Sequence, residues 1–376
     1  MTVKPAWPVL PLGAIVELQR GFDLPTNKRS HGTVPVVGSS GVIGQHDQEA
    51  VAGPGVTLGR AGAIGVATYV PCNFWPLNTT LFVTNFLGNN PKFIYYLLHS
   101  MDFSGYNSGG VQPMLNRNYI RDIPVPLPSY SEQQAIAEVL SALDDKIAVN
   151  ERCAETALAL AKARIEVVEQ AEPVCISDVA DVFDGPHATP KKTAEGPWFL
   201  SISSLKGGVL DLAESAHLSE DDFPRWTRRV QPSEGDVLFS YETRLGEAAL
   251  MPHGVRASLG RRMGLLRPKP GGISSALLLH GYLSQQFQEE VRRRTVHGAT
   301  VDRIPLKDMP TWPITLPAVG VRDKLSAALE ALHASIDQVA VENRTLSDLR
   351  DALIPQLITG TIRVKDAMRV VEDAAS

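Results

Sequence analysis

The sequence is poor in cysteine and has no long apolar run. Its three cysteines, Cys72, Cys153 and Cys175, show no Cys-x-x-Cys spacing. An odd number with this spacing argues against a disulfide framework and a zinc site, and favours buried free thiols. The longest apolar stretches, such as GVTLGRAGAIGVATYV, are interrupted well before the roughly 20 residues that a spanning helix needs, and no signal peptide is indicated. We therefore expect a cytoplasmic protein.

Motifs of several common catalytic chemistries are missing as well. There is no GxxxxGK[ST] phosphate loop, no HExxH, no GxSxG and no paired Cys or His at metal-ligand spacing. The glycine-rich run GRAGAIG at 59–65 lacks the strand–GxGxxG–helix context of a dinucleotide site. The Asn-Pro-Pro-Tyr type of motif, with which an amino-methyltransferase holds its target base, is not found either. These absences predict a recognition protein that is not an enzyme and has no metal or cofactor of its own.

Charge is distributed unevenly along the chain. The net charge of −5 argues against an indiscriminate nucleic-acid binder. Residues 131–173 hold four basic and nine acidic side chains, whereas residues 225–269 hold nine basic and four acidic ones. The second segment therefore predicts a local basic surface on a protein that is acidic elsewhere.

The chain contains an internal repeat. Residues 120–147 read IRDIPVPLPSYSEQQAIAEVLSALDDKI, and residues 306–336 read LKDMPTWPITLPAVGVRDKLSAALEALHASI. Asp122 and Asp308 are 186 positions apart, and Leu140 and Leu329 are 189 apart, so only three residues of insertion separate the two registers. The repeat predicts a pseudo-dimer built from one chain.

Each copy of the repeat ends in a long amphipathic helix. Apolar residues follow a 4,3,4,3 spacing in both helices, which is the seam pattern of helices that pair. At 35 to 40 residues and 1.5 Å per residue, each helix would extend about 50 Å, too far for one small domain to cover. Asn150 and Asn343 lie on the seams, where they would either fix the register or face solvent. The residues expected at the helix-pair interface are Leu140, Leu143, Ile147, Leu329, Leu332 and Ile336.

Before each helix the sequence is mixed and rich in Gly, Pro and β-branched residues. We predict an α+β fold in which two α/β domains form a tandem pseudo-two-fold repeat, separated by two long antiparallel coiled-coil helices. The expected boundaries are 1–130 for domain 1, 131–172 for the central helix, 173–317 for domain 2, and 318–376 for the C-terminal helix and tail.

The chain resembles the specificity subunit of type I restriction–modification systems over nearly its whole length. The resemblance rests on EQQAIAEVLSALDDKI at 132–147 and LRDALIPQLITGTIRV at 349–364. In domain 1, LGRAGAIGVATYV, FWPLNTTLFV and SGGVQPMLNRNYIRDIPVP also match the family pattern of a target-recognition domain. FSYETRLGEAAL and HGATVDRIPLKDM in domain 2 only approximate it.

The resemblance implies a non-catalytic DNA-binding subunit that reads a bipartite, asymmetric site in double-stranded DNA. Each recognition domain would bind one half-site, and the helix pair would set the gap between them. Two modification subunits would methylate adenine at N6 with S-adenosylmethionine, and restriction subunits would cleave with ATP, so both cofactors belong to partners. We expect no membrane association.

Candidate DNA contacts follow from residue chemistry, from loop placement and from the resemblance. Arg, Asn and Gln pair bidentately with base edges, and glycines beside Arg60 permit a close backbone approach. The candidates are Arg60, Asn78, Thr79, Gln112, Asn116, Arg117 and Asn118 in domain 1, and Arg244, Arg261, Arg262, Thr300, Asp302 and Arg303 in domain 2.

Two alternatives remain open from the sequence. The chain would serve as the specificity module of another methylation or defence assembly, or it would be a coiled-coil scaffold that binds only proteins. The scaffold leaves the Gly-rich, Arg-containing loops of both domains unexplained.

Overall fold

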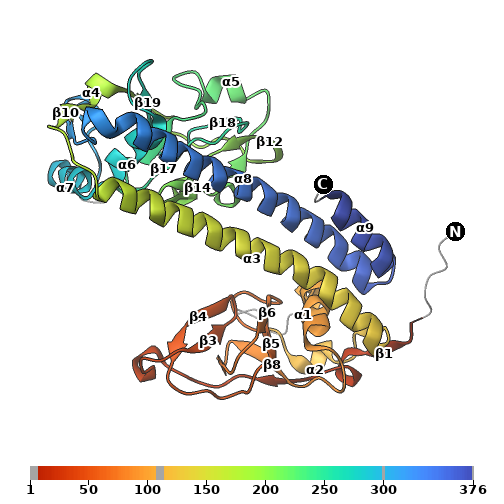
Figure 1. Ribbon diagram of the computed structural model, residues 1–376. Coiled ribbons are helices and arrows are strands. Elements are labelled where there is room, and N and C mark those ends of the chain that lie inside the picture. Colours follow the sequence, from red (N-terminus) through yellow and green to blue (C-terminus); the bar gives the residue numbers. More distant parts are fainter. Residues whose placement is uncertain (1–6, 107–113, 299–300, 375–376) are drawn as a thin grey trace. The chain divides into compact units, whose positions relative to one another are not determined.

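The computed structural model describes residues 7–106, 114–298 and 301–374 (Figure 1). The chain divides into two compact units: unit 1 is Met1–Ala148 with Asn343–Ser376, and unit 2 is Val149–Glu342. Both boundaries fall inside long helices. The boundaries expected at 130, 172 and 317 separate helices from sheets, whereas each compact unit combines a sheet-rich domain with parts of both helices.

Unit 1 is built around three small sheets. A four-stranded sheet has the order β2-β8-β5-β6, a three-stranded sheet has the order β4-β3-β7, and β1 pairs with β9. Its strands are β1 Val9–Pro11, β2 Glu17–Arg20, β3 Val34–Gly38, β4 Gly41–His46, β5 Gly55–Gly59, β6 Ala67–Val70, β7 Trp75–Pro76, β8 Thr80–Asn85 and β9 Pro124–Pro126. Its short helices are η1 Leu12–Ala14, η2 Thr26–Lys28, α1 Pro91–Ser100, η3 Ser104–Tyr106 and α2 Arg117–Ile120.

Unit 2 repeats this arrangement. Its four-stranded sheet has the order β11-β19-β16-β17, its three-stranded sheet has the order β15-β12-β18, and β10 pairs with β20. The strands of these sheets are β10 Val174–Cys175, β11 Ala180–Asp184, β12 Thr193–Phe199, β15 Ala216–His217, β16 Val237–Ser240, β17 Ala248–Leu250, β18 Ala257–Ser258, β19 Met263–Pro268 and β20 Pro313–Ile314. Its short helices are α4 Ile176–Val179, η4 Ile202–Ser204, η5 Leu212–Glu214, α5 Phe223–Trp226, α6 Ser275–Leu283, α7 Gln285–Arg294 and η6 Met309–Thr311.

The strand orders of the two units correspond one to one. The pairs β3·β7 and β12·β18 are both parallel, while the strands of both four-stranded sheets are antiparallel. Unit 2 adds a hairpin of β13 Leu205–Lys206 and β14 Val209–Leu210 between β12 and β15. The predicted α+β fold with an internal repeat is confirmed.

Two glycines fix the same corner in the two units. Gly21 follows β2, and a Cβ there would lie 2.2 Å from the carbonyl oxygen of Leu77. Gly185 follows β11, and a Cβ there would lie 2.6 Å from the carbonyl oxygen of Met263. Both glycine amides donate to the first residue of the neighbouring strand, Gly21 to Thr80 at 3.0 Å and Gly185 to Met263 at 3.0 Å. A side chain at either position would push the strand ends apart.

Helices α3 (Tyr130–Glu166) and α8 (Val319–Ile358) are 37 and 40 residues long, as their apolar spacing predicts. In unit 1, Leu140 and Leu143 of α3 lie in one core with Leu353 and Leu357 of α8. In unit 2, Ala161 of α3 clusters with Leu325 and Leu329 of α8, with Leu332 packed beside them. The beginning of each helix thus packs near the end of the other, so the two run antiparallel (Figure 1). A last helix, α9 (Val364–Ala374), adds Ala367 to the core of unit 1.

The seam asparagines bond across the helix pair. Asn150 is 3% exposed and donates to Glu342 Oε2 at 2.9 Å. Asn343 donates to the carbonyl of Ile147 at 3.4 Å. Of the two alternatives that the sequence left open, the structure therefore supports the role in register over a solvent-facing position.

The cysteines differ from expectation. All three are free, as their spacing predicts, but they are exposed rather than buried. Cys153 of α3 is not one of the residues of the apolar seam, so an exposed position agrees with the seam pattern. The expectation of burial came from the general preference of cysteine for protein interiors. In the described part of the chain, no helix is both long and apolar enough to span a bilayer.

Candidate nucleic-acid interface

Three segments of unit 1 meet at one end of its four-stranded sheet. They are the loop after β5 (residues 60–66), the turn before β8 (77–79) and residues 114–118. Arg60 joins all three, because its amide donates to the carbonyl of Thr79 at 2.8 Å and its own carbonyl accepts from Leu115 at 2.8 Å. Ala61 and Met114 form an antiparallel bridge beside it. We call these three segments loop cluster 1.

The same hydrogen bonds recur in unit 2. The amide of Tyr241 donates to the carbonyl of Arg262 at 3.1 Å, and the carbonyl of Tyr241 accepts from Ile304 at 2.8 Å. Glu242 and Arg303 form the matching antiparallel bridge. Residues 241–247, 260–262 and 301–305 therefore form loop cluster 2, in which Tyr241 occupies the position of Arg60, and Arg262 that of Thr79.

Arg60 is the centre of the polar contacts in loop cluster 1. Its guanidinium donates to the carbonyl of Asn78 at 3.3 Å. Partial burial, and then the nearby charge of Arg20, lower the pKa of Arg60 from its ordinary value. Asn78 donates to the carboxylate of Asp23, which also lies 3.8 Å from the Arg20 guanidinium. The guanidinium groups of Arg60 and Arg20 are thus close enough for their charges to interact, and a bound anion would stabilise them.

The predicted residues 116–118 stand at the start of α2. Asn116 caps this short helix by accepting from the amide of Asn118 at 3.0 Å. Arg117 is exposed and donates to the carbonyl of Leu18 in β2 at 3.1 Å. Arg117 and Asn118 line a surface recess of about 280 Å³. Gln112 lies outside the described residues.

In loop cluster 2, Arg262 and Thr243 both adopt a left-handed backbone conformation, with φ of 73° and 69°. Arg262 forms an ion pair with Glu242 at 2.8 Å and donates to Thr243 Oγ1 at 3.3 Å. Such a φ is strained for a β-branched residue, and strain of this kind concentrates at functional sites. In unit 1 the position of Thr243 is taken by Gly62, with φ of 86°.

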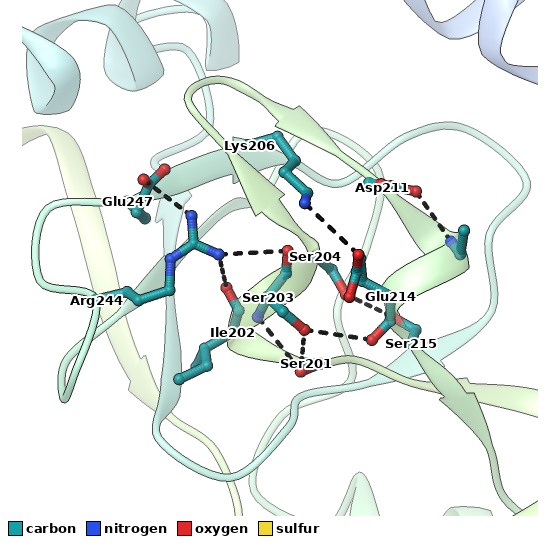
Figure 2. Close-up of polar contacts among 11 residues, drawn as sticks. Ser201, Ile202, Ser203, Ser204, Lys206, Asp211, Glu214, Ser215, Arg244 and Glu247 are labelled. Carbon is teal, nitrogen blue, oxygen red and sulfur yellow. Dashed lines mark hydrogen bonds and ion pairs between the residues drawn. The ribbon is translucent and has the colours of Figure 1, made fainter. Parts of the chain in front are cut away.

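The side chains of the other candidate residues in unit 2 differ in the contacts that they make within the domain. Arg261 and Arg303 are exposed, and neither makes a side-chain hydrogen bond or ion pair with the residues described. Asp302 lies 3.1 Å from His297 Nδ1. Arg244 donates into its own domain, to the carbonyls of Ile202 and Ser203 and to Glu247 (Figure 2). Thr300 lies outside the described residues.

The structure therefore brings Arg60, Asn78 and Thr79 together with Asn116, and Arg261 and Arg262 together with Arg303. Sequence reasoning missed Arg20, the last residue of β2, whose charge acts on Arg60, and Asp23, which accepts from Asn78. The signal in the sequence was Gly21, which lies between them. Because it has no side chain, the backbone here can pack against the turn before β8. Reasoning from sequence also missed Glu242 and Glu247, which form ion pairs with Arg262 and Arg244, respectively. Among the residues with described positions, no group of three or more His, Cys, Asp or Glu side chains is placed to hold a metal ion.

Comparison with known proteins connects this geometry to one family. Residues 5–157 match the family model described as the type I restriction modification DNA specificity domain. The MjaIX specificity subunit of a type I restriction enzyme from Methanocaldococcus jannaschii is 22% identical over 310 residues, which are 73% of this chain and 70% of that protein. The MjaVIII specificity subunit from the same organism is 21% identical over 280 residues, 68% of this chain and 65% of its own length.

A solved structure shares the fold. The S subunit of a type I restriction–modification system from M. genitalium superposes with a TM-score of 0.61 at 14% sequence identity. The superposition covers 95% of this chain and 98% of that one, so the similarity extends through both sheet-rich domains and both long helices.

Proposed function

We propose that this chain is a specificity subunit of a type I restriction–modification system, as its match to the family model over residues 5–157 and its relatives support, and that its two sheet-rich domains bind the two unlike halves of one bipartite DNA site. Loop cluster 1 would contact one half-site and loop cluster 2 the other. Because the two clusters carry different side chains on the same backbone frame, the site would be asymmetric. Arg60, Asn78 and Asn116 on one side, and Arg261, Arg262 and Arg303 on the other, are the residues expected to contact bases or phosphates.

One observation carries this proposal. The two units place three segments at the same end of the same sheet with the same hydrogen bonds, yet Arg60 corresponds to Tyr241 and Thr79 to Arg262. A constant frame with exchanged side chains is what sequence recognition by two related domains requires. A purely structural corner has no need of exposed guanidinium groups such as those of Arg261 and Arg303, which pair with no side chain among the residues that the structure describes.

The chemistry would reside in partner subunits. Two modification subunits would methylate adenine at N6 with S-adenosylmethionine, and restriction subunits would cleave DNA with ATP. This chain would be non-catalytic, carry neither cofactor and act in the cytoplasm, where it would direct the complex to its site. The exposed outer faces of α3 and α8, including Val149 at 44% and Val341 at 58% exposure, are available for such subunits.

The test is single-molecule sequencing of methylated adenine in cells that express this chain together with the modification subunit of its system. Cells lacking only this chain are the control. We expect a split, asymmetric motif with a fixed gap that disappears in the control. A motif that persists without the chain, or the lack of any split motif in both cultures, would contradict the proposal.

A further inference from the structure

The hairpin β13–β14 is an addition to unit 2. In unit 1, β3 leads through a tight turn directly to β4, whereas in unit 2 residues 200–215 separate β12 from β15. The addition is held together internally by a hydrogen bond between the Ser204 and Ser215 hydroxyls at 2.7 Å. An ion pair between Lys206 and Glu214 at 3.7 Å supports it further (Figure 2).

The tip of the hairpin lies between loop cluster 2 and the helix α3. On one side, the amide of Gly208 donates to the carbonyl of Ala248 in β17 at 2.8 Å. On the other side, the Gly208 backbone approaches α3 so closely that a Cβ would lie 2.9 Å from Leu158 Cδ1. Gly208 has a φ of 125°, which favours glycine, so this contact depends on the residue present.

Arg244 and Glu247 connect the loop after β16 to the added segment 200–215: Arg244 contacts η4, just before the hairpin, and Glu247 contacts the hairpin tip. The Arg244 guanidinium donates to the carbonyls of Ile202 and Ser203, each at 3.4 Å, and to Glu247 Oε1 at 3.0 Å. The other carboxylate oxygen of Glu247 accepts from the amide of Gly207 at 3.0 Å. The Glu247 carboxylate thus links Arg244 to the hairpin tip. Figure 2 shows the Arg244 side chain directed toward Ile202 and Ser203, with Glu247 beside its guanidinium.

Both side chains are about two-thirds buried, with 36% and 32% of their surfaces exposed. Nη1 and Nη2 of the guanidinium donate to three acceptors of its own domain, so the side chain is directed into the domain. In unit 1, Ala63 and Val66 stand at the corresponding positions, so loop cluster 1 has no such ion pair. Loop cluster 1 instead closes through small residues, and a Cβ on Gly59 would lie 1.9 Å from the carbonyl oxygen of Ala63.

We propose that Arg244 and Glu247 are positioning residues that hold the recognition loop 241–247 against the β13–β14 hairpin, and through that hairpin against helix α3. The inference rests on the proposed function and adds to it a division of roles. Arg261 and Arg303 contact DNA, whereas Arg244 sets the conformation of the loop between them. The geometry of loop cluster 2 then depends on a hairpin that unit 1 lacks.

The experiment measures DNA binding by the full complex with a duplex carrying the motif found by methylome sequencing. Affinity is determined at several salt concentrations, and discrimination is determined with single-base changes in each half-site. The variants are Arg244→Ala, Arg244→Lys, Glu247→Gln and the double variant Arg244→Ala/Glu247→Gln. Arg261→Ala is the matched control for a DNA-contacting arginine, and Lys206→Ala is the control for an ion pair on the same hairpin.

Arg244→Ala is expected to lower discrimination roughly tenfold at several positions of one half-site, as the loss of a charge-assisted hydrogen bond would. The other half-site is unaffected, and the slope of log affinity against log salt concentration does not change. Glu247→Gln gives the same result and the double variant is no worse, because the two side chains act as a unit. Arg244→Lys does not restore discrimination, since an ammonium group cannot span the three acceptors. Arg261→Ala reduces the magnitude of the slope of log affinity against log salt concentration by about 1.

Other results overturn the inference. A salt slope lowered by about 1 in Arg244→Ala and restored in Arg244→Lys identifies a phosphate contact. Loss of discrimination at one base pair alone identifies a base contact. Additive effects of the two substitutions, or no effect of either, show that the pair does not position the loop. Loss of the split motif from cells with the unmodified chain is a separate result that concerns only the proposed function.

Discussion

Arg60 and Arg20 present two cations at one corner of unit 1, and this gives the first prediction. Since burial, and then the charge of Arg20, lower the pKa of Arg60, the protein disfavours the charged form of this side chain, and a DNA phosphate would stabilise it. We expect Arg60→Ala and Arg20→Ala each to weaken binding and to lower the salt slope by about 1. Salt-dependent fluorescence anisotropy with a labelled duplex measures both quantities. Lys324→Ala, an exposed cation on α8, is the control, and an unchanged slope in both arginine variants would contradict the prediction.

The candidate residues show what sequence alone resolves. Arg60 and Arg244 look alike in sequence, since each lies in a loop that follows a buried strand. The structure separates them, because the equivalent of Arg60 is Tyr241, and Arg244 is engaged by carbonyls some 40 positions away. Sequence reasoning identified the loops correctly but not the acceptors inside them, since those acceptors are backbone carbonyls that carry no sequence signature.

A buried histidine pair predicts how stability depends on pH. His280 of α6 and His333 of α8 are 3% and 6% exposed, and their Nε2 atoms are 3.0 Å apart. Burial, followed by the charges of His333 and Lys162, lowers the pKa of His280 to about 3, and burial lowers the pKa of His333 to about 4. Unfolded histidines bind protons near pH 6.5. The unfolded state therefore takes up more protons as pH falls, and the stabilisation present above pH 6.5 is lost progressively toward pH 4 and below.

Asp337, also on α8, acts in the opposite direction. Burial, and then the charge of Glu234, raise its pKa to about 6, so the folded state gains a proton there before the unfolded state does. With two histidines against one aspartate, we expect a net loss of stability between pH 6.5 and pH 4. Urea denaturation of unit 2 followed by tryptophan fluorescence measures this loss. His280→Gln should flatten the dependence, and an equally steep curve in this variant would refute the assignment.

At the scale of elements, the helices were the most predictable part of the chain. A seam repeated over 35 to 40 residues predicted α3 and α8, because heptad spacing is a local property that survives any tertiary context. The position of Asn150 was less predictable, since a seam asparagine is buried only if a partner helix faces it. Glu342 provides that partner from 192 positions away. The short strands were harder still, because two-residue strands such as β7 and β18 exist only through their pairing with β3 and β12.

The helix pair gives a third prediction, which concerns the gap between half-sites. Deleting one heptad from α3 (residues 145–151) and the facing heptad from α8 (341–347) shortens each helix by about 10 Å. At about 3.4 Å per base pair, we expect the gap in the methylated motif to shorten by up to three base pairs. Methylome sequencing reads the gap directly. Deleting a heptad from α3 alone is the control and should abolish assembly, while an unchanged gap in the double deletion would exclude the helices as the determinant of spacing.

At the scale of the whole molecule, the repeat makes the two halves of the chain formally interchangeable. The strand orders correspond one to one, and the backbone hydrogen bonds of Arg60 and Tyr241 go to residues at corresponding positions of the two units. The matches also extend to the glycines that follow β2 and β11. A chain with this symmetry behaves as two copies of one ancestral half joined end to end, each half offering one recognition domain and one long helix.

This symmetry gives the last prediction. A chain ending at residue 170 keeps the first recognition domain and α3 but loses α8, which leaves the seam around Leu140 and Leu143 uncovered. A second copy can supply an antiparallel helix of the same pattern, so we expect a homodimer. With two identical domains the methylated motif should become palindromic, each half matching the half-site that loop cluster 1 binds in the full chain. Light scattering measures the dimer, and methylated-adenine sequencing measures the motif. Leu140→Asp in the half chain should prevent both, whereas Val149→Asp, on the exposed face, should not prevent the dimer. A monomer that still methylates the original asymmetric motif would show that the two halves are not equivalent in function.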